Sequence, residues 1–284
     1  MLFGKKTCAH CDSEIDVAEA TCPVCGSDLR KEGPKTFSNQ MTWIPWVKQL
    51  IIFIVGLLGL NIAATVFSVI FMAANGDIDN AALTINFLSY LVIFCSLAAL
   101  VWMHYKGLFK SFKRWKPYVF GLAGLGALLV FNMGYNAFIQ AVHPITDNAN
   151  ETAVNSYILS SPVMAFFVIV IFGPVVEELT YRVGLFSLLS RVHIVLGYIL
   201  TALTFAFIHF DWSCIISYLA GDIEAAVFNE VLINELLNIP LYIAAGVVFN
   251  FLYHKFGLAS SLTAHMTNNL LSFMLVFLAG VING

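Results

Sequence analysis

Two adjacent glutamates and an arginine lie in one of the most apolar stretches of the chain. Glu177, Glu178 and Arg182 are flanked by residues 163–172 and 183–189, which carry no charge. A charge at the centre of a lipid bilayer costs about 2.5–3.5 kcal/mol on insertion scales. Such a cluster is therefore retained only if its members are paired, solvated in a cavity or used in chemistry.

The spacing of the three charges separates two roles. Glu178 and Arg182 are four residues apart, so they share a helix face and can form an ion pair. Glu177 is rotated by about 100° and is left free to face a cavity as a general base. Pro174 predicts that a helix restarts there, with both carboxylates near its first turn. The alternative is a purely structural cluster that holds two helices together.

Two further apolar segments carry polar residues at helical spacing. Phe205 and His209 are four residues apart, and so are His265 and Asn269. Asp211 either orients His209 or is a loop acid. An intramembrane histidine and asparagine on one face indicate function by default, with interhelical hydrogen bonding as the structural alternative. A carboxylate and a histidine that activate water, with two donors to a developing oxyanion, predict amide hydrolysis.

The order of these motifs resembles the CPBP family, the CAAX proteases and bacteriocin-processing enzymes (also called Abi), which are intramembrane endopeptidases. The resemblance covers roughly residues 160–275. It implies that Glu177 and His209 activate water and that His265 and Asn269 form the oxyanion site. The residues that carry it are Glu177-Glu178-x-x-x-Arg182, Phe205-x-x-x-His209 and His265-x-x-x-Asn269.

Two departures from the family pattern bear on substrate access. Glycine often follows the arginine directly in the family, whereas here Val183 precedes Gly184. Residues 211–238 also form a long connection between two motifs. Neither departure removes a predicted catalytic group.

The predicted site also raises the question of an active-site metal. Glu177, His209 and His265 offer two histidines and one carboxylate, a donor set found in catalytic zinc sites with an open position. The chain lacks the HExxH motif that puts two histidines on one helix. A glutamate-and-histidine mechanism without a metal explains Asn269 better, so the metal is the alternative.

Four cysteines near the N-terminus form a second group of chemical interest. Each CxxC pair offers two sulfurs from one tight loop, and zinc takes four thiolates in a tetrahedron. Because the module is too short to build a hydrophobic core, metal binding would supply its folding free energy. We expect a zinc ribbon at 1–30, with disulfides or a redox pair as the alternative, and a polar linker at 31–42. Four thiolates close the coordination shell, which favours a protein partner or regulation over catalysis. Ten residues separate the pairs Cys8, Cys11 and Cys22, Cys25.

The composition defines the surroundings of both groups. The 284-residue chain is 60% hydrophobic and 11% charged, whereas a soluble domain carries about 25% charged residues. We therefore predict an all-α polytopic membrane protein in a lipid bilayer, with a transmembrane domain at 43–284 and no nucleic-acid partner. With about 20 apolar residues per span, seven spans are expected, the fourth broken at Gly173-Pro174. They are roughly 45–72, 82–103, 118–141, 161–189, 194–210, 239–254 and 258–281.

The charged segments predict the orientation of these spans. With the N-terminus inside, all 14 lysines and arginines fall on the cytosolic side or at cytosolic helix ends, and the opposite loops are acidic. This positive-inside bias predicts a cytosolic N-terminus and an outer C-terminus. Residues 211–238 are expected to form an extracytoplasmic excursion or a further partial span. A bacterial cell membrane is the expected location.

Three functions remain in competition. The leading hypothesis is an intramembrane endopeptidase that cuts a peptide or a membrane protein near the cytosolic half of the bilayer. The second is a non-catalytic membrane scaffold or bacteriocin-immunity protein. Every motif position is filled in this chain, which argues against a loss of catalytic activity. The third is a small transporter or proton relay, which predicts an inverted repeat that the sequence does not show.

Overall fold

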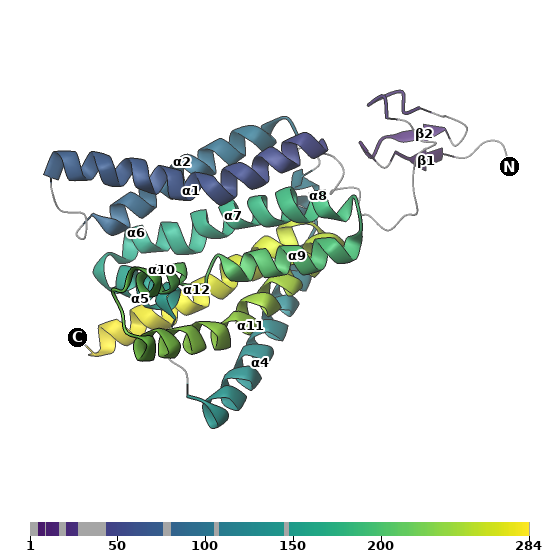
Figure 1. Ribbon diagram of the computed structural model, residues 1–284. Helices are drawn as coiled ribbons and strands as arrows, with labels where there is room; N and C mark the ends of the chain where they lie inside the picture. The colour runs from purple at the N-terminus through teal and green to yellow at the C-terminus, as the bar shows by residue number, and fades with distance from the viewer. Residues whose placement is uncertain are drawn as a thin grey trace.

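The computed structural model describes residues 5–8, 10–16, 21–27, 44–75, 81–104, 108–144 and 148–283. The predicted linker, 31–42, lies outside the described residues. Apart from a two-stranded antiparallel ribbon, in which Lys6 pairs with Ile15, the elements are helices (Figure 1). In chain order they are β1 (Lys5–Thr7), β2 (Glu14–Asp16), α1 (Trp46–Asn75), α2 (Ala82–Trp102), the 3₁₀ helix η2 (Phe109–Lys113), α4 (Lys116–Val142), α5 (Ala149–Ser160), α6 (Pro162–Phe166), η3 (Phe167–Phe172), α7 (Gly173–Glu177), η4 (Glu178–Phe186), α8 (Ser187–Ser190), α9 (Ile194–Phe207), α10 (Trp212–Ala220), α11 (Ala225–Phe256) and α12 (Leu258–Asn283).

The helices confirm the predicted all-α polytopic class. Among the described residues, six helical stretches are long and apolar enough to cross a membrane, counting α6 to α8 as one. The number rises to seven if α9 and α10 together form one span, bent by 56°. The chain is thus a multi-pass membrane protein preceded by a small cysteine module.

The region after α9 differs from the sequence-based expectation. The sixth predicted span, 239–254, is only the second half of the 32-residue helix α11, which begins at Ala225. Of the expected excursion at 211–238, only the short helix α10 and its flanking turns lie outside a long helix. Two of the acids that interrupt the apolar pattern, Glu230 and Glu235, lie within this helix, whereas Asp222 and Glu224 lie in the turn before it. Glu235 is buried and accepts hydrogen bonds from the backbone amides of Ala149 and Asp211.

The fourth span is continuous, so the predicted break at Gly173-Pro174 is wrong. The helix runs from Pro162 to Ser190 and contains two π-helical stretches, η3 and η4. At the junction the amide of Gly173 bonds to the carbonyl of Val168, five residues back. The wider π turn carries the chain past Pro174 without ending the helix. Glu177 and Glu178 therefore lie in mid-helix, and the expected placement in a first turn is wrong as well.

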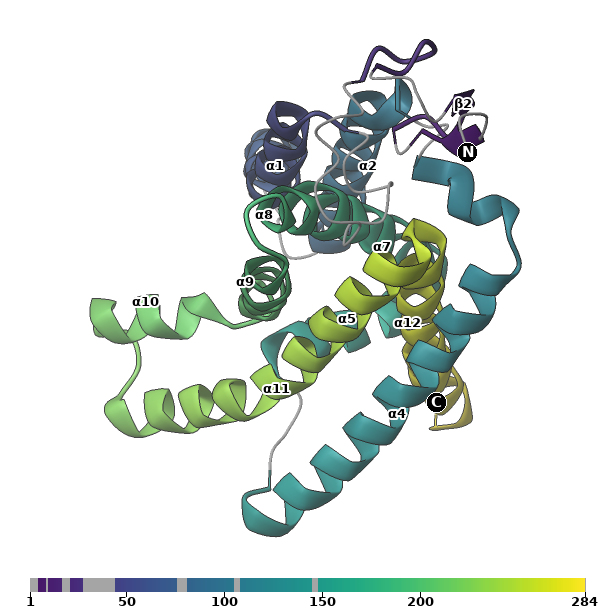
Figure 2. The ribbon, with the colours of Figure 1, turned by 90° about the vertical axis from the view of Figure 1, so that its right-hand side faces the viewer.

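The helix α6–α8 is the centre of the fold. It lies between the pair α1 and α2 on one side and α9, α11 and α12 on the other (Figures 1 and 2). Glycines permit the close packing: a Cβ on Gly184 would lie 3.0 Å from the backbone nitrogen of Phe53, and one on Gly246 would lie 2.9 Å from Cα of Ala202. Small residues at such contacts let membrane helices approach closely. These contacts hold the central helix against α1, and α11 against α9.

Candidate active site

Glu177 lies on the central helix with its carboxylate turned into the bundle. Its side chain is 14% exposed, and its Oε2 atom is buried without a hydrogen-bond partner among the described residues. Nε2 of His265, from α12, lies 3.6 Å from this oxygen. That separation is longer than a direct hydrogen bond and suits a water held between the two groups.

His265 links the two adjacent glutamates. Its Nδ1 lies 3.0 Å from Oε1 of Glu178, and because a carboxylate oxygen accepts, this nitrogen carries a proton. Its ring also stacks on Phe249, with centroids 4.6 Å apart. Glu178 therefore fixes the orientation of His265, in addition to the predicted pairing with Arg182.

Arg182 forms the predicted ion pair with Glu178, and its guanidinium group is otherwise surrounded by aromatic rings. Its NH1 lies 3.4 Å from Oε1 of Glu178, and both side chains are 0% exposed. None of its guanidinium nitrogens has a hydrogen-bond partner among the described residues. Instead, its Cζ lies 4.6 Å from the ring centroid of Phe205 and 5.1 Å from that of Phe249. Two cation–π contacts and one ion pair thus stabilise a fully buried cation.

His209 lies just beyond the last turn of α9 and contributes a defined tautomer. Its Nδ1 donates to the carbonyl of Phe205 at 2.8 Å. A carbonyl only accepts, so the proton of a neutral ring is on Nδ1 and Nε2 keeps its lone pair. Asp211 does not orient this ring, because its carboxylate caps α10 through Ser213. The loop-acid reading of Asp211 is the one that fits.

Asn269 is tied to the central helix. Its Nδ2 donates to the carbonyl of Ile169 at 2.9 Å. In the local π pattern this carbonyl would accept the amide of residue 174, which is a proline and has no N–H. The neighbouring helix satisfies the orphaned carbonyl, as is common in membrane bundles. Asn268, the alternative partner of His265 by spacing, instead contacts Oδ1 of Asn269 at 3.5 Å.

Two cavities meet at the glutamate–histidine pair. The first, of about 510 Å³, lies among α2, α5, α11 and α12 and reaches His265 and Asn269. The second, of about 730 Å³, lies among α1, η4 and α9. Both are lined by Glu177 and His209. A chain that passed from one cavity to the other would run past the carboxylate of Glu177.

Tyr242 and Glu235 belong to this region, although sequence reasoning did not select them. The Tyr242 ring stacks on His209, with centroids 4.4 Å apart and planes within 15°. Its hydroxyl is bonded by the side-chain amide of Asn148, the N-cap of α5. Glu235, seven residues earlier on α11, holds the amide of Asp211. Their seven-residue spacing on one helix face was the available signal.

The active-site donors do not converge as a metal site in this structure. Among the described residues, the group of cysteines is the only set of three or more His, Cys, Asp or Glu whose ligand atoms lie within 4.8 Å of one another. Nδ1 of His265 bonds to Glu178 and Nδ1 of His209 bonds to a carbonyl, which leaves Nε2 of each ring as the possible ligand atom, as in many metal sites. The two-histidine, one-carboxylate site stays an alternative, whose ligand atoms are not gathered in this structure.

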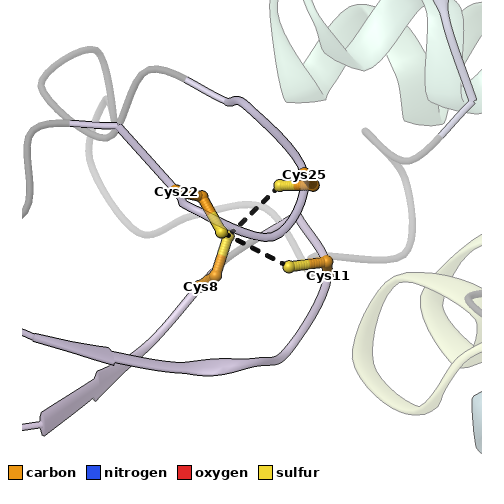
Figure 3. A group of neighbouring side chains, drawn as sticks. All are labelled: Cys8, Cys11, Cys22 and Cys25. Carbon is orange, nitrogen blue, oxygen red and sulfur yellow. Dashed lines mark hydrogen bonds between the residues drawn. The ribbon is translucent and has the colours of Figure 1, made fainter.

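The four cysteines do converge (Figure 3). The Sγ atoms of Cys8 and Cys25 are 3.7 Å apart and those of Cys11 and Cys22 are 3.6 Å apart. Zinc–sulfur bonds of about 2.3 Å in a tetrahedron place sulfurs about 3.8 Å apart. All four are free thiols, so the structure favours a metal site over the disulfide alternative.

The two cysteine loops have the same backbone design. The amide of Cys8 bonds to the carbonyl of Ser13, and that of Cys22 to the carbonyl of Ser27. Each loop turns through a residue with positive φ, Asp12 at 55° and Gly26 at 72°. This repeat is typical of two metal-binding knuckles that face each other.

Without a cation, the pKa values of the Cys11 and Cys22 thiols are shifted in opposite directions. Burial raises the pKa of the Cys11 thiol to about 12. Burial also acts to raise the pKa of Cys22, but the backbone amides of Cys25 and Val24 donate to its sulfur, and that pKa lies below its ordinary value. A bound divalent cation would deprotonate the remaining thiols.

Comparison with known proteins agrees with the membrane core. Residues 159–271 match the family described as Type II CAAX prenyl endopeptidase Rce1-like. This match confirms the resemblance to the CPBP family over the segment that contains all three motifs. At the level of the family it supports an intramembrane endopeptidase, and hence a hydrolase. No curated protein and no solved structure matches the chain.

Proposed function

We propose that this protein is an intramembrane endopeptidase in which Glu177 and His209 activate water. The observation that carries the proposal is the carboxylate of Glu177, whose buried Oε2 lacks a hydrogen-bond partner in the described structure. It lies beside His265, at the junction of two cavities. A general base needs a free acceptor within reach of a water and a substrate. Space on both sides of that base suits cleavage within a chain.

The reaction follows from these positions. Glu177 takes one proton from water, and the water oxygen attacks the carbonyl carbon of the scissile peptide. The carbonyl electrons move to oxygen and form an oxyanion. When the carbonyl re-forms, the C–N bond breaks and the proton held by Glu177 passes to the leaving nitrogen. The remaining OH completes the new carboxyl group.

His209, His265 and Asn269 supply the rest of the site. Nε2 of His209 accepts a hydrogen bond from the attacking water. His265 and Asn269 donate to the oxyanion, an effect that is commonly worth about 3–4 kcal/mol per donor. Because Nδ1 of His265 already donates to Glu178, its donor to the oxyanion is Nε2–H of the doubly protonated ring. The Asn269 amide has two N–H groups. One bonds to Ile169, so the other is available for the substrate.

Glu178 and Arg182 do not contact the substrate themselves but support the residues that do. Glu178 is bonded to His265 and fixes the ring that must donate to the oxyanion. Arg182 balances the charge of Glu178 where both side chains are fully buried. We assign them as positioning residues that support the site.

The ribbon and the surroundings complete the proposal. Cys8, Cys11, Cys22 and Cys25 would hold one zinc ion, which links two knuckles that have almost no core of their own. The substrate is a peptide or a membrane-protein segment, and the ribbon recruits a protein partner. The protein lies in a bacterial cell membrane with the ribbon in the cytosol.

The test compares membrane-protein fragments in cells that carry the wild type or Glu177→Gln. Glu230→Gln, a change at an exposed acid on α11, is the matched control. We expect fragments that depend on Glu177 and not on Glu230. Identical fragments in all three strains, with the variants present at normal level, would instead favour the non-catalytic scaffold.

A further inference from the structure

The two ends of the bundle differ in their access to the site. Most of the exposed residues that line the two cavities lie toward the end away from the ribbon, near α5, α10 and the second half of α12 (Figure 1). Two exposed residues of the second cavity, Asn61 and Leu200, lie in the middle of α1 and α9, and none lies at the ribbon end. In the first cavity Leu275, in the second half of α12, is 70% exposed, and Asn150, at the start of α5, is also exposed. In the second cavity Trp212, at the start of α10, is 52% exposed.

The ribbon end of the site is closed by packed layers. On the ribbon side of Glu177 lies the fully buried pair of Glu178 and Arg182. The next layer contains the buried hydrogen bond between Ser187 and Tyr253, with 3.0 Å between their hydroxyl oxygens. Beyond it, Arg191 bonds to Gln49 Oε1 and to the Ile44 carbonyl, both at 2.8 Å, and so ties α8 to the start of α1. Among the described residues, neither of the two cavities that contain Glu177 is lined by a residue of these layers.

A third cavity at the ribbon end does not alter this conclusion. It has a volume of about 420 Å³ and is lined by apolar side chains of α2, η2 and α12, with Glu178 as its single charged neighbour. Neither Glu177 nor either predicted catalytic histidine lines it. A substrate in this cavity would therefore be separated from the base.

The charges of the described residues are sorted between the same two ends. Apart from Arg182, the described cationic side chains lie at the ribbon end, where Lys110 forms an ion pair with Asp12 of the ribbon. The remaining members of that group are Lys48, Lys113, Arg114, Lys116, Arg191 and Lys255. The other end carries carboxylates and, among described residues, no lysine or arginine. These acids are Glu151, Asp211, Asp222, Glu224 and Glu230.

The positive-inside rule assigns the cationic end to the cytosol. A cluster of reduced thiols at that end agrees with a reducing compartment. The cavities that reach Glu177 open at the opposite end, which is then extracytoplasmic.

We propose that the substrate is a polypeptide segment exposed on the extracytoplasmic side, such as an exported peptide or an outer segment of a membrane protein. This inference rests on the proposed function and replaces the expectation of cleavage in the cytosolic half of the bilayer. It also separates this protein from a processing enzyme for lipidated C-termini in the cytosol.

Thiol labelling tests the direction of opening without the need for a substrate. In a Cys95→Ser, Cys214→Ser background, Ser272→Cys places a thiol on the first cavity and Lys113→Cys places one at the ribbon end. The probe is a charged, membrane-impermeant maleimide added to intact cells. We expect Ser272→Cys to be labelled at once, and Lys113→Cys only after permeabilisation. Leu275→Cys serves as a second cavity variant should Ser272→Cys fail to accumulate.

The reverse pattern, with Lys113→Cys labelled in intact cells and Ser272→Cys only after permeabilisation, would overturn the inference. Mapping the Glu177-dependent cuts then tests the substrate class. Cuts in extracytoplasmic segments support the proposal. Cuts in cytosolic segments contradict it but still support the proposed endopeptidase function. If Ser272→Cys is labelled from outside but no cut depends on Glu177, the proposed function fails, and the substrate proposal fails with it.

Discussion

Asn269 donates its side-chain amide to the carbonyl of Ile169, across the interface between α12 and the central helix. That carbonyl has no backbone N–H donor within its own helix, because position 174, five residues later, is a proline. The proline before the glutamate pair and the asparagine of the last motif are therefore connected by one hydrogen bond. Pro174 helps to position a predicted donor to the oxyanion.

This connection predicts coupling between two distant substitutions. Pro174→Ala restores an N–H that can bond to Ile169, so Asn269→Leu should cost less stability in that background than in the wild type. Interhelical hydrogen bonds in membranes contribute about 0.6–2 kcal/mol, and the coupling should be of that size. A double-mutant cycle of thermal unfolding in detergent measures it. Strictly additive effects would mean that the two residues are independent.

A second prediction concerns the contact between Tyr242 and His209. Aromatic stacking contributes about 0.5–1.5 kcal/mol, so Tyr242→Leu should lower kcat by about two- to tenfold by releasing the His209 ring. Tyr242→Phe keeps the ring, loses only the bonds to Asn148 and Asn150, and should stay closer to the wild type. Peptidase rates at matched folded fraction distinguish the two. Equal losses in both variants would show that the hydroxyl, and not the stack, matters.

The buried pair of Glu178 and Arg182 gives a third prediction. Removal of one partner from a buried pair typically costs about 3–5 kcal/mol, because the other charge is left uncompensated. Arg182→Met should therefore destabilise the protein strongly, and Glu178→Gln added to it should recover part of that loss. Thermal melting of the purified variants gives the comparison. A double variant no more stable than Arg182→Met would contradict the pairing.

The fourth prediction is one zinc ion per chain in the ribbon. Cys8→Ser with Cys22→Ser removes one ligand from each knuckle and should abolish the bound zinc, whereas Cys95→Ser should leave it unchanged. Metal analysis of the purified proteins decides this. Acidification should also release the zinc, since its ligands bind as thiolates. Zinc retained in the double variant would place the metal elsewhere.

Much of the framework follows directly from the sequence because it depends on local rules. The CxxC spacing predicted the cysteine cluster, and the four-residue spacings predicted which polar groups share a face. The lengths of the apolar segments predicted seven membrane spans, and the described part of the structure has six or seven. Family resemblance agrees with the match at 159–271.

The differences arise where tertiary contacts override local signals. Pro174 predicts a helix break, but a π turn and a side chain from α12 keep the helix continuous. The acids near Glu235 suggest a loop, but that carboxylate is bonded to two backbone amides and remains within α11. Sequence spacing could not show that Glu178 also contacts His265, since the two residues are 87 positions apart.

The central claim is that Glu177 acts as the base in peptide hydrolysis. The most direct measurement is the cleavage rate of a substrate identified from the fragment comparison, with purified wild type, Glu177→Gln and Glu230→Gln in matched detergent. Glu177→Gln should bind the substrate and melt like the wild type but lose turnover by about two orders of magnitude or more, whereas Glu230→Gln should retain it. Full cleavage by a folded Glu177→Gln protein would contradict the account.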